Sequence, residues 1–110
     1  EVIEPVPMTD IRKAIKESLP GLITSIKGDE RNVILTLARM WVTASTGEIR
    51  SKDLAAEWAI PQLPFEYAIL LDKASKAYLG GYIDKWKGME SEVTELVNYM
   101  KKSIESSLNL

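Results

Sequence analysis

A row of polar side chains follows one face of a helix that is otherwise hydrophobic. Asp29, Asn32 and Arg39 share this face with Thr36 and Thr43, because they are spaced by three and four residues or multiples of a turn. A carboxylate can bind a cationic amine, and a guanidinium matches the geometry of a phosphate. The alternative is an ordinary solvated face on which Asp29 only caps the helix. Few polar residues interrupt the hydrophobic sequence here, so the row fits the wall of a cleft.

Lys52 and Tyr78 are two further candidates for ligand contact. Lys52 follows Ser51, a residue type favoured at helix N-caps. An ammonium group beside a helix N-terminus adds to the backbone N–H groups that bind phosphate there. The ordinary interpretation is that Lys52 is a solvated lysine and that Tyr78 belongs to the core or its rim. From the residue pattern alone, both interpretations stay open.

The composition excludes several classes of function. The 110 residues contain no histidine and no cysteine, so the usual zinc ligands, the usual general base and a thiol nucleophile are missing. A net charge of −2 offers no general attraction for nucleic acid, which we do not expect as a partner. No segment is long and apolar enough to span a membrane, and no signal peptide opens the sequence. We therefore expect a cytoplasmic location and no membrane partner.

Hydrophobic periodicity predicts an all-α fold, a compact bundle of five or six helices with a long C-terminal helix. Pro20 and Gly21 should end the first helix, and Gly47 should end the central one. Trp41, Trp58 and Trp86 fall at hydrophobic positions and are expected in the core. The expected helices cover residues 10–18, 29–46, 51–59, 64–79 and 83–108, with Thr9 as the first cap and a short helical turn near residues 22–26.

Two other functions deserve comparison with a small-molecule site. The segment from Gly47 to Pro61, followed by another helix, has the rhythm of a helix-turn-helix. Its second helix would present residues 64–68, which contain no Arg, Lys, Asn or Gln for base edges or phosphates. A stand-alone helical interaction module without catalytic activity is the stronger alternative, because such a bundle can act by presenting a surface.

Several ordered blocks of the sequence resemble the C-terminal helical domain of aminoglycoside nucleotidyltransferases that act on spectinomycin and streptomycin. The similarity covers essentially the whole chain and is greatest for the spectinomycin 9-adenylyltransferases. It extends to the opening Pro5-Val6-Pro7 and to the tail from Trp86 onward. The blocks that carry it are residues 28–41 (Gly-Asp-Glu-Arg-Asn-Val-Ile-Leu-Thr-Leu-Ala-Arg-Met-Trp), 46–49, 51–53, 55–59, 63–64 and 77–80.

This resemblance implies a two-domain enzyme that transfers AMP from ATP to a hydroxyl of spectinomycin in an interdomain cleft. In the family, an N-terminal nucleotidyltransferase domain holds Mg²⁺ and supplies the catalytic base. Residues 1–8 would then be an extended linker from that domain, and residues 9–110 a helical substrate-binding domain that forms one wall of the cleft. No catalytic residue and no metal ligand is expected in this chain, which we predict to be inactive by itself.

The resemblance also assigns roles to the candidate residues. Asp29 matches a carboxylate that contacts the cationic aminocyclitol, and Asn32 matches a polar position beside it. Lys52 and Arg39 match basic positions near the ATP phosphates, and Tyr78 matches a tyrosine on the same wall.

One departure from the family pattern concerns the choice of drug. Relatives that also modify streptomycin have a tryptophan and an aspartate where this chain has Pro20 and Ser25. Neither residue can replace a stacking ring or an anionic partner. The resemblance therefore implies spectinomycin, and not streptomycin, as the substrate.

Overall fold

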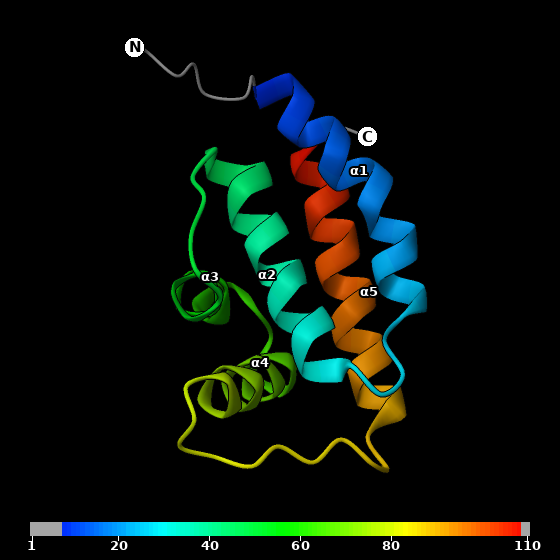
Figure 1. Cartoon of the computed structure of the whole chain (residues 1–110), viewed down its shortest axis with the longest axis vertical. Helices are drawn as coiled ribbons and strands as arrows, with labels where there is room; N and C mark the ends of the chain where they lie inside the picture. Colours follow the sequence, from blue (N-terminus) through cyan, green and yellow to red (C-terminus); the bar gives the residue numbers. More distant parts are fainter. Residues whose placement is uncertain (1–7, 109–110) are drawn as a thin grey trace.

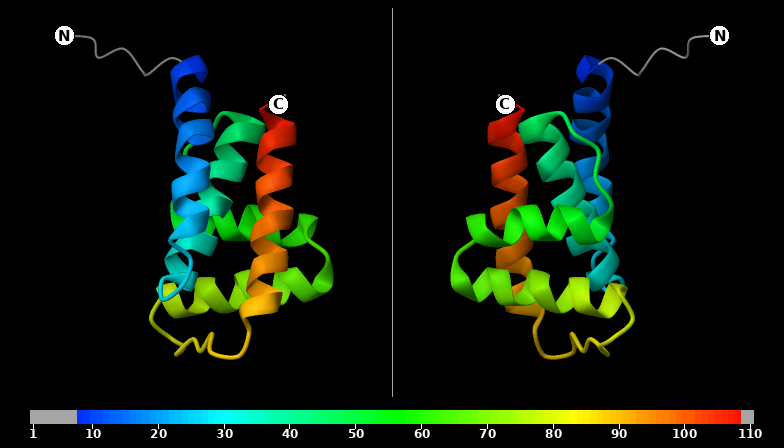
Figure 2. Two further views of the ribbon diagram at one scale, coloured as in Figure 1. Left: turned by 90° about the vertical axis from the view of Figure 1, so that its right-hand side faces the viewer. Right: turned by 90° about the vertical axis from the view of Figure 1, so that its left-hand side faces the viewer.

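The computed structural model describes residues 8–108, which form an all-α bundle with a long last helix (Figure 1), as the periodicity predicts. Helices α1, α2 and α5 contact one another and stand side by side, whereas α3 and α4 run across them (Figure 2). No strand occurs among the described residues. The elements are α1 (Met8–Thr24), α2 (Glu30–Thr46), α3 (Lys52–Ala59), the 3₁₀ turn η1 (Ile60–Gln62), α4 (Phe65–Tyr78) and α5 (Glu90–Ser107).

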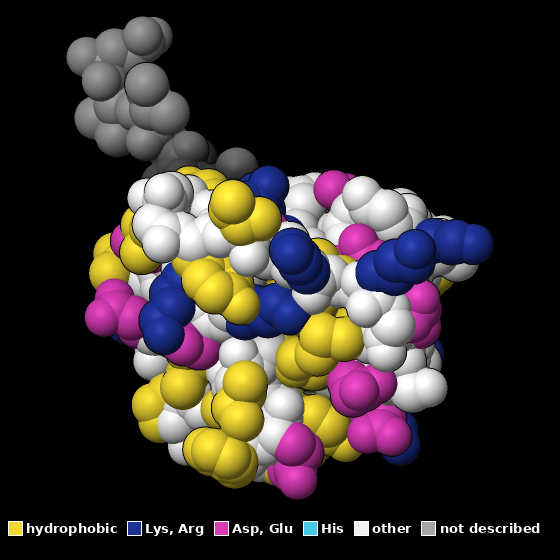
Figure 3. Space-filling view, turned by 90° about the horizontal axis from the view of Figure 1, so that it is seen from below, with side chains coloured by type: hydrophobic (Ala, Val, Ile, Leu, Met, Phe, Trp, Pro, Cys, Tyr) yellow, Lys and Arg dark blue, Asp and Glu magenta, His cyan; other side chains and the backbone are white. Residues whose placement is uncertain are grey.

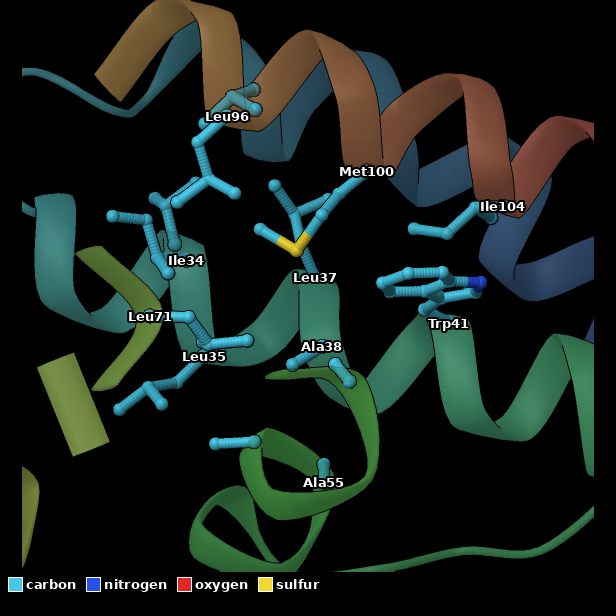
Figure 4. Close-up of a cluster of buried hydrophobic side chains, with 14 of the residues drawn as sticks. Ile34, Leu35, Leu37, Ala38, Trp41, Ala55, Leu71, Leu96, Met100 and Ile104 are labelled. Carbon is cyan, nitrogen blue, oxygen red and sulfur yellow. The ribbon is translucent and has the colours of Figure 1, made fainter. Parts of the chain in front are cut away.

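Helix α2 is the centre of the bundle and contacts each of the other four α-helices. Figure 4 shows Ile34, Leu37 and Trp41 on the side of α2 that faces α5, where they meet Leu96, Met100 and Ile104. On the other side, Ala38 faces Ala55 of α3, and both side chains are fully buried. Their small size lets α3 pack closely across α2. Burial of both sides leaves α2 only a narrow exposed face, on which Asp29, Asn32 and Arg39 lie.

The expectation that Pro20 and Gly21 end the first helix is wrong, because α1 continues to Thr24. Pro20 lacks the N–H that would bond to the carbonyl of Lys16. Pro20 and Lys16 both lie on the exposed side of α1. On the buried side, Ile15 and Leu19 pack into the core and hold the helix in place. The helix also begins at Met8, so Thr9 lies within it rather than at its cap.

The expectation that the last helix begins near residue 83 is also wrong, since α5 begins at Glu90. Residues 79–89 cross the end of the bundle as an irregular segment (Figure 1). Gly80 and Gly88 have φ values of 92° and 85°, which favour glycine and are incompatible with a continuous helix. Trp86 is half-buried against the core from this segment, as is Trp58 of α3, whereas Trp41 is buried as expected.

Arg12 connects α1 to the ends of two other helices. Its guanidinium donates to the carbonyl of Ala44 in the last turn of α2, at 3.0 Å, and to the carbonyl of Ser107 at the end of α5. Carbonyl groups in a last helical turn have no partner within their own helix. One cation therefore satisfies two helix ends, where the dipoles favour positive charge. The proposed linker, residues 1–8, falls outside the described residues except for Met8.

Candidate functional site

Asp29 occupies the N-cap position of α2, as the sequence predicts, but its side chain makes no capping hydrogen bond. Its carboxylate instead accepts a hydrogen bond from the Asn32 amide, with Nδ2 and Oδ2 3.1 Å apart. Both side chains are exposed. The carboxylate therefore keeps free acceptor positions directed at solvent, beside the positive end of the α2 dipole.

Lys52 joins the same group from the first residue of α3. Its ammonium donates to Asn32 Oδ1 at 2.7 Å and lies 5.6 Å from the centre of the Tyr78 ring. That distance allows a cation–π interaction. Packing of α3 and the end of α4 against α2 thus brings together four of the five candidate residues. We call Asp29, Asn32, Lys52 and Tyr78 the polar row.

Arg39, the fifth candidate, lies on the same helix about 10 Å from Asn32, since seven residues separate them at 1.5 Å each. Its Nε donates to the carbonyl of Arg50 at 3.0 Å, and the side chain is exposed. It borders a different hollow, which we call the α1–α2 hollow. That hollow has a volume of about 210 Å³ and is lined by Ile11, Ile15, Thr36, Arg39, Met40, Thr43 and Ile49.

Thr43 was expected on the exposed polar face, but it is only 7% exposed. Its hydroxyl donates to the carbonyl of Glu48 at 2.8 Å and so holds the connection between α2 and α3. Thr36 is half-buried. The exposed part of the face therefore consists of Asp29, Asn32 and Arg39.

A second hollow, of about 240 Å³, adjoins Asp29 and Asn32 and is lined largely by polar groups. Arg31 forms part of its wall and lies with Nε 3.7 Å from the carboxylate of Asp84. The same guanidinium donates to the carbonyl of Ala77 at 3.2 Å, next to Tyr78 at the end of α4. Asp84 in turn accepts a 2.6 Å hydrogen bond from the indole of Trp86. These contacts link the start of α2 to the end of α4 and to residues 79–89.

Sequence reasoning did not single out Arg31 or Asp84. Arg31 lies within the Gly-Asp-Glu-Arg-Asn block, but it is one position off the polar face. Asp84 falls in a segment that the periodicity assigns to a helix. Its proximity to Arg31 depends on the path of residues 79–89, which spacing alone cannot provide.

Lys73 holds this segment against α4. Its ammonium lies 4.7 Å from the centre of the Trp86 ring and donates to the carbonyl of Lys85. Figure 3 views this end of the molecule, where basic, acidic and hydrophobic side chains lie next to one another. No single sign of charge covers this end of the molecule.

One ionisable group near the row has a shifted pKa. The Ser51 hydroxyl donates to the carboxylate of Asp53 and holds the pKa of that group below its usual value of 3.8. Among residues 8–108, no three His, Cys, Asp or Glu side chains are grouped so that they could hold a metal ion. No helix in that range is long and apolar enough to cross a membrane.

The chain is thus an all-α domain that carries the polar row on its surface. Comparison with known families is more specific. A family model described as "Aminoglycoside adenylyltransferase, C-terminal domain" matches residues 1–103. The chain belongs to this family, as the resemblance of its motifs indicates.

Individual relatives agree with this assignment. Spectinomycin 9-adenylyltransferase of Staphylococcus aureus is 67% identical over 108 residues, which are 98% of this chain and 42% of the relative. The Campylobacter jejuni protein of the same name is 55% identical over 108 residues, with the same two coverages of 98% and 42%. The chain thus spans about two fifths of the length of these relatives.

A solved structure extends the comparison to three dimensions. It is the crystal structure of spectinomycin adenyltransferase AAD(9) from Enterococcus faecialis with ATP and spectinomycin. The two folds match with a TM-score of 0.85 at 33% identity, over 94% of this chain and 40% of that chain. The bundle described above is therefore the fold of a domain found in an enzyme with both ligands bound.

Proposed function

We propose that this chain is the C-terminal domain of an antibiotic-resistance enzyme that transfers AMP from ATP to a hydroxyl of spectinomycin and releases pyrophosphate. Residues 9–110 form one wall of the drug and nucleotide cleft, and residues 1–8 connect it to an N-terminal nucleotidyltransferase domain. The observation that carries the proposal is the continuous polar row. It places a carboxylate, an amide, an ammonium group and a phenol together in a domain whose relative was crystallised with both ligands.

Asp29 and Asn32 face the drug in this proposal. Spectinomycin is a cationic aminocyclitol, and a carboxylate gives its ammonium groups a charge-assisted hydrogen bond. The Asp29 carboxylate retains acceptor capacity, because it receives only the Asn32 amide and no backbone cap bond. A second domain over this face would exclude water and strengthen the interaction.

Lys52, Arg39 and Tyr78 face the nucleotide. The ammonium and the guanidinium would balance the negative charge of the triphosphate and of the departing pyrophosphate. Both cations fit this role, because each is held by one neutral oxygen, Asn32 Oδ1 or the Arg50 carbonyl, and neither is neutralised by a carboxylate in the contacts described. The Tyr78 ring lies 5.6 Å from the Lys52 ammonium, within the range of a cation–π interaction.

The catalytic base and the Mg²⁺ ligands are proposed to lie on the N-terminal domain. When bound, Mg²⁺ would stabilise charge on the phosphates. Among residues 8–108, no three metal-binding side chains are grouped together. We expect the isolated chain to be inactive and the full-length enzyme to act in the cytoplasm.

The direct test incubates the full-length protein with ATP, Mg²⁺ and spectinomycin, and with streptomycin in a parallel reaction, and detects the adenylylated drug by mass spectrometry. We expect the spectinomycin product alone, because Pro20 and Ser25 cannot supply a stacking ring or an anion. Modification of streptomycin would contradict the proposed specificity. A full-length protein without either activity would favour the stand-alone interaction module.

A matched pair of lysine variants separates the nucleotide role of Lys52 from a loss of surface charge. Lys52→Gln should raise the KM for ATP by about tenfold, as expected for a lost charge-assisted phosphate contact. The control is Lys76→Gln, since the Lys76 side chain is 63% exposed and pairs with Asp72 on the same helix, α4. Equal effects of the two variants would remove Lys52 from the nucleotide site.

A further inference from the structure

The α1–α2 hollow presents hydrophobic surface to solvent beside the proposed nucleotide site. Ile11 and Met40 are half-buried in it, Ile15 is nearly buried, and Ile49 is 71% exposed at its rim. Single exposed hydrophobic residues are common on proteins, but several around one hollow indicate a contact surface. The hollow plays no part in the polar row.

The hollow and the polar row are formed by neighbouring parts of the same segment of chain. Arg39 lines the hollow and donates to the carbonyl of Arg50, which follows Ile49. Two residues later, Lys52 begins α3 and contacts Asn32. A protein domain that covered the hollow would therefore contact Arg39 and would lie beside the polar row.

The position at which the chain enters the bundle indicates which part of the protein covers the hollow. Helix α1 begins at Met8, one turn before Ile11, so whatever precedes α1 is attached next to the hollow. The family model is that of a C-terminal domain, and the relatives are more than twice as long as this chain. Their remaining length must largely precede the segment that corresponds to this chain.

We propose that the α1–α2 hollow, with Ile49 at its rim, is the docking surface for the N-terminal domain of the same polypeptide. This inference rests on the two-domain organisation given under the proposed function. Apolar contact at the hollow sets the position of the catalytic domain, and the polar row beside it stays open for drug and nucleotide. Burial of Ile49 in the full-length protein supplies part of the driving force for closing the cleft.

The test compares two exposed isoleucines in the full-length protein. Ile49→Asp places a charge in the proposed contact, whereas Ile83→Asp places one at a residue that is 82% exposed in the segment 79–89. That segment lies at the end of the bundle opposite to the start of α1 (Figure 1). Both substitutions replace an exposed hydrophobic side chain, so they should have similar effects on the folding of the bundle itself.

We expect Ile49→Asp to increase the radius of gyration measured by small-angle X-ray scattering and to raise the KM for ATP by about tenfold. Ile83→Asp should change neither. Ile49→Ala should give a smaller change in the same direction. If Ile49→Asp does not fold, Ile49→Ala is the variant that tests the docking surface. Scattering needs no catalysis, so it tests domain docking even if the protein fails to modify spectinomycin.

Two results would overturn the inference. One is a wild-type-like radius of gyration and KM in the folded Ile49 variants. The other is a wild-type dimer that Ile49→Asp converts to a monomer with unchanged domain arrangement, because the hollow would then bind a second copy of the chain.

Discussion

The ammonium of Lys52 lies 2.7 Å from the side-chain carbonyl of Asn32, although 20 residues separate them in sequence. The other end of the same amide donates to Asp29. Asn32 can serve both neighbours in only one orientation, with its oxygen toward the cation and its NH₂ group toward the anion. The amide therefore connects the residue proposed for the nucleotide to the residue proposed for the drug.

Removal of this connecting amide should weaken both ends of the site. In Asn32→Ala, Lys52 and Asp29 each lose the hydrogen bond that orients them toward the ligands, so we expect each KM to rise by about fivefold in the full-length enzyme. The hydrogen bonds are exposed, and the free energy of unfolding should change by no more than about 0.5 kcal/mol.

Steady-state kinetics and chemical denaturation provide these values. Asn98→Ala, at an exposed asparagine of α5, serves as the control and should leave both KM values unchanged. A rise in only one KM would show that Asn32 serves one ligand and does not connect the two.

The three middle helices could be located from sequence to within one or two residues. Their hydrophobic spacing is regular, and their boundaries carry Asp29, Gly47, Ser51 and Pro64, residue types that begin or end helices. Residues 83–89 misled the periodicity because Trp86 and Met89 pack against the core at helix-like intervals without being helical. Gly88 has a positive φ that interrupts a helix, and hydrophobic spacing carries no information about this backbone conformation.

The site was less accessible to sequence reasoning than the helices. Spacing placed Asp29, Asn32 and Arg39 on one face, since all three belong to a single helix. It could not place Lys52 against Asn32, because that contact depends on how α3 crosses α2. Only the resemblance to a family assigned Lys52 and Asn32 to one site, and it assigned no role to Arg31.

The hydroxyl of Ser51 gives a prediction for pH dependence. In Ser51→Ala, the pKa of Asp53 should rise toward its ordinary value, because the hydroxyl is the largest cause of its lowering. A lowered pKa in the folded state stabilises the protein above the unfolded pKa, and this contribution is lost as the pH falls through the folded pKa. The difference in stability between wild type and Ser51→Ala should therefore be full at neutral pH and shrink below about pH 4.

Carboxyl titration by NMR measures the pKa of Asp53, and thermal unfolding between neutral and acidic pH measures the difference in stability. Ser91→Ala, at an exposed serine in the first turn of α5, should show no such pH-dependent difference. An unchanged pKa of Asp53 in Ser51→Ala would contradict the assigned hydrogen bond.

Arg31 is predicted to position the two sides of the site relative to each other. Arg31→Ala loses the hydrogen bond to the Ala77 carbonyl and the contact with Asp84, and should destabilise the domain by about 1–2 kcal/mol. Because Ala77 adjoins Tyr78, both KM values should rise while kcat changes less. Arg31→Lys keeps the charge near Asp84 but not the guanidinium fork, so it should recover stability more than it recovers KM.

The control for Arg31 is Arg50→Ala. Its guanidinium pairs with Glu48 at 2.7 Å on the surface, and such pairs contribute little to stability. Full recovery of both KM values in Arg31→Lys would show that a positive charge at position 31 is enough for ligand binding, and that the two-pronged guanidinium does not position the site.

Asp29→Asn should separate drug binding from helix capping. Asparagine is as good an N-cap residue as aspartate, and the carboxylate makes no cap bond, so the free energy of unfolding should hardly change. Loss of the charge should raise the KM for spectinomycin by about tenfold, because the charge-assisted hydrogen bond to the drug amine becomes a neutral one. The KM for ATP should stay the same, and Asp10→Asn, in the first turn of α1, should alter neither constant. Kinetics with each substrate varied in turn, beside denaturation of the same samples, decide the question: a destabilised Asp29→Asn with unchanged drug KM would return Asp29 to a purely structural role at the start of α2.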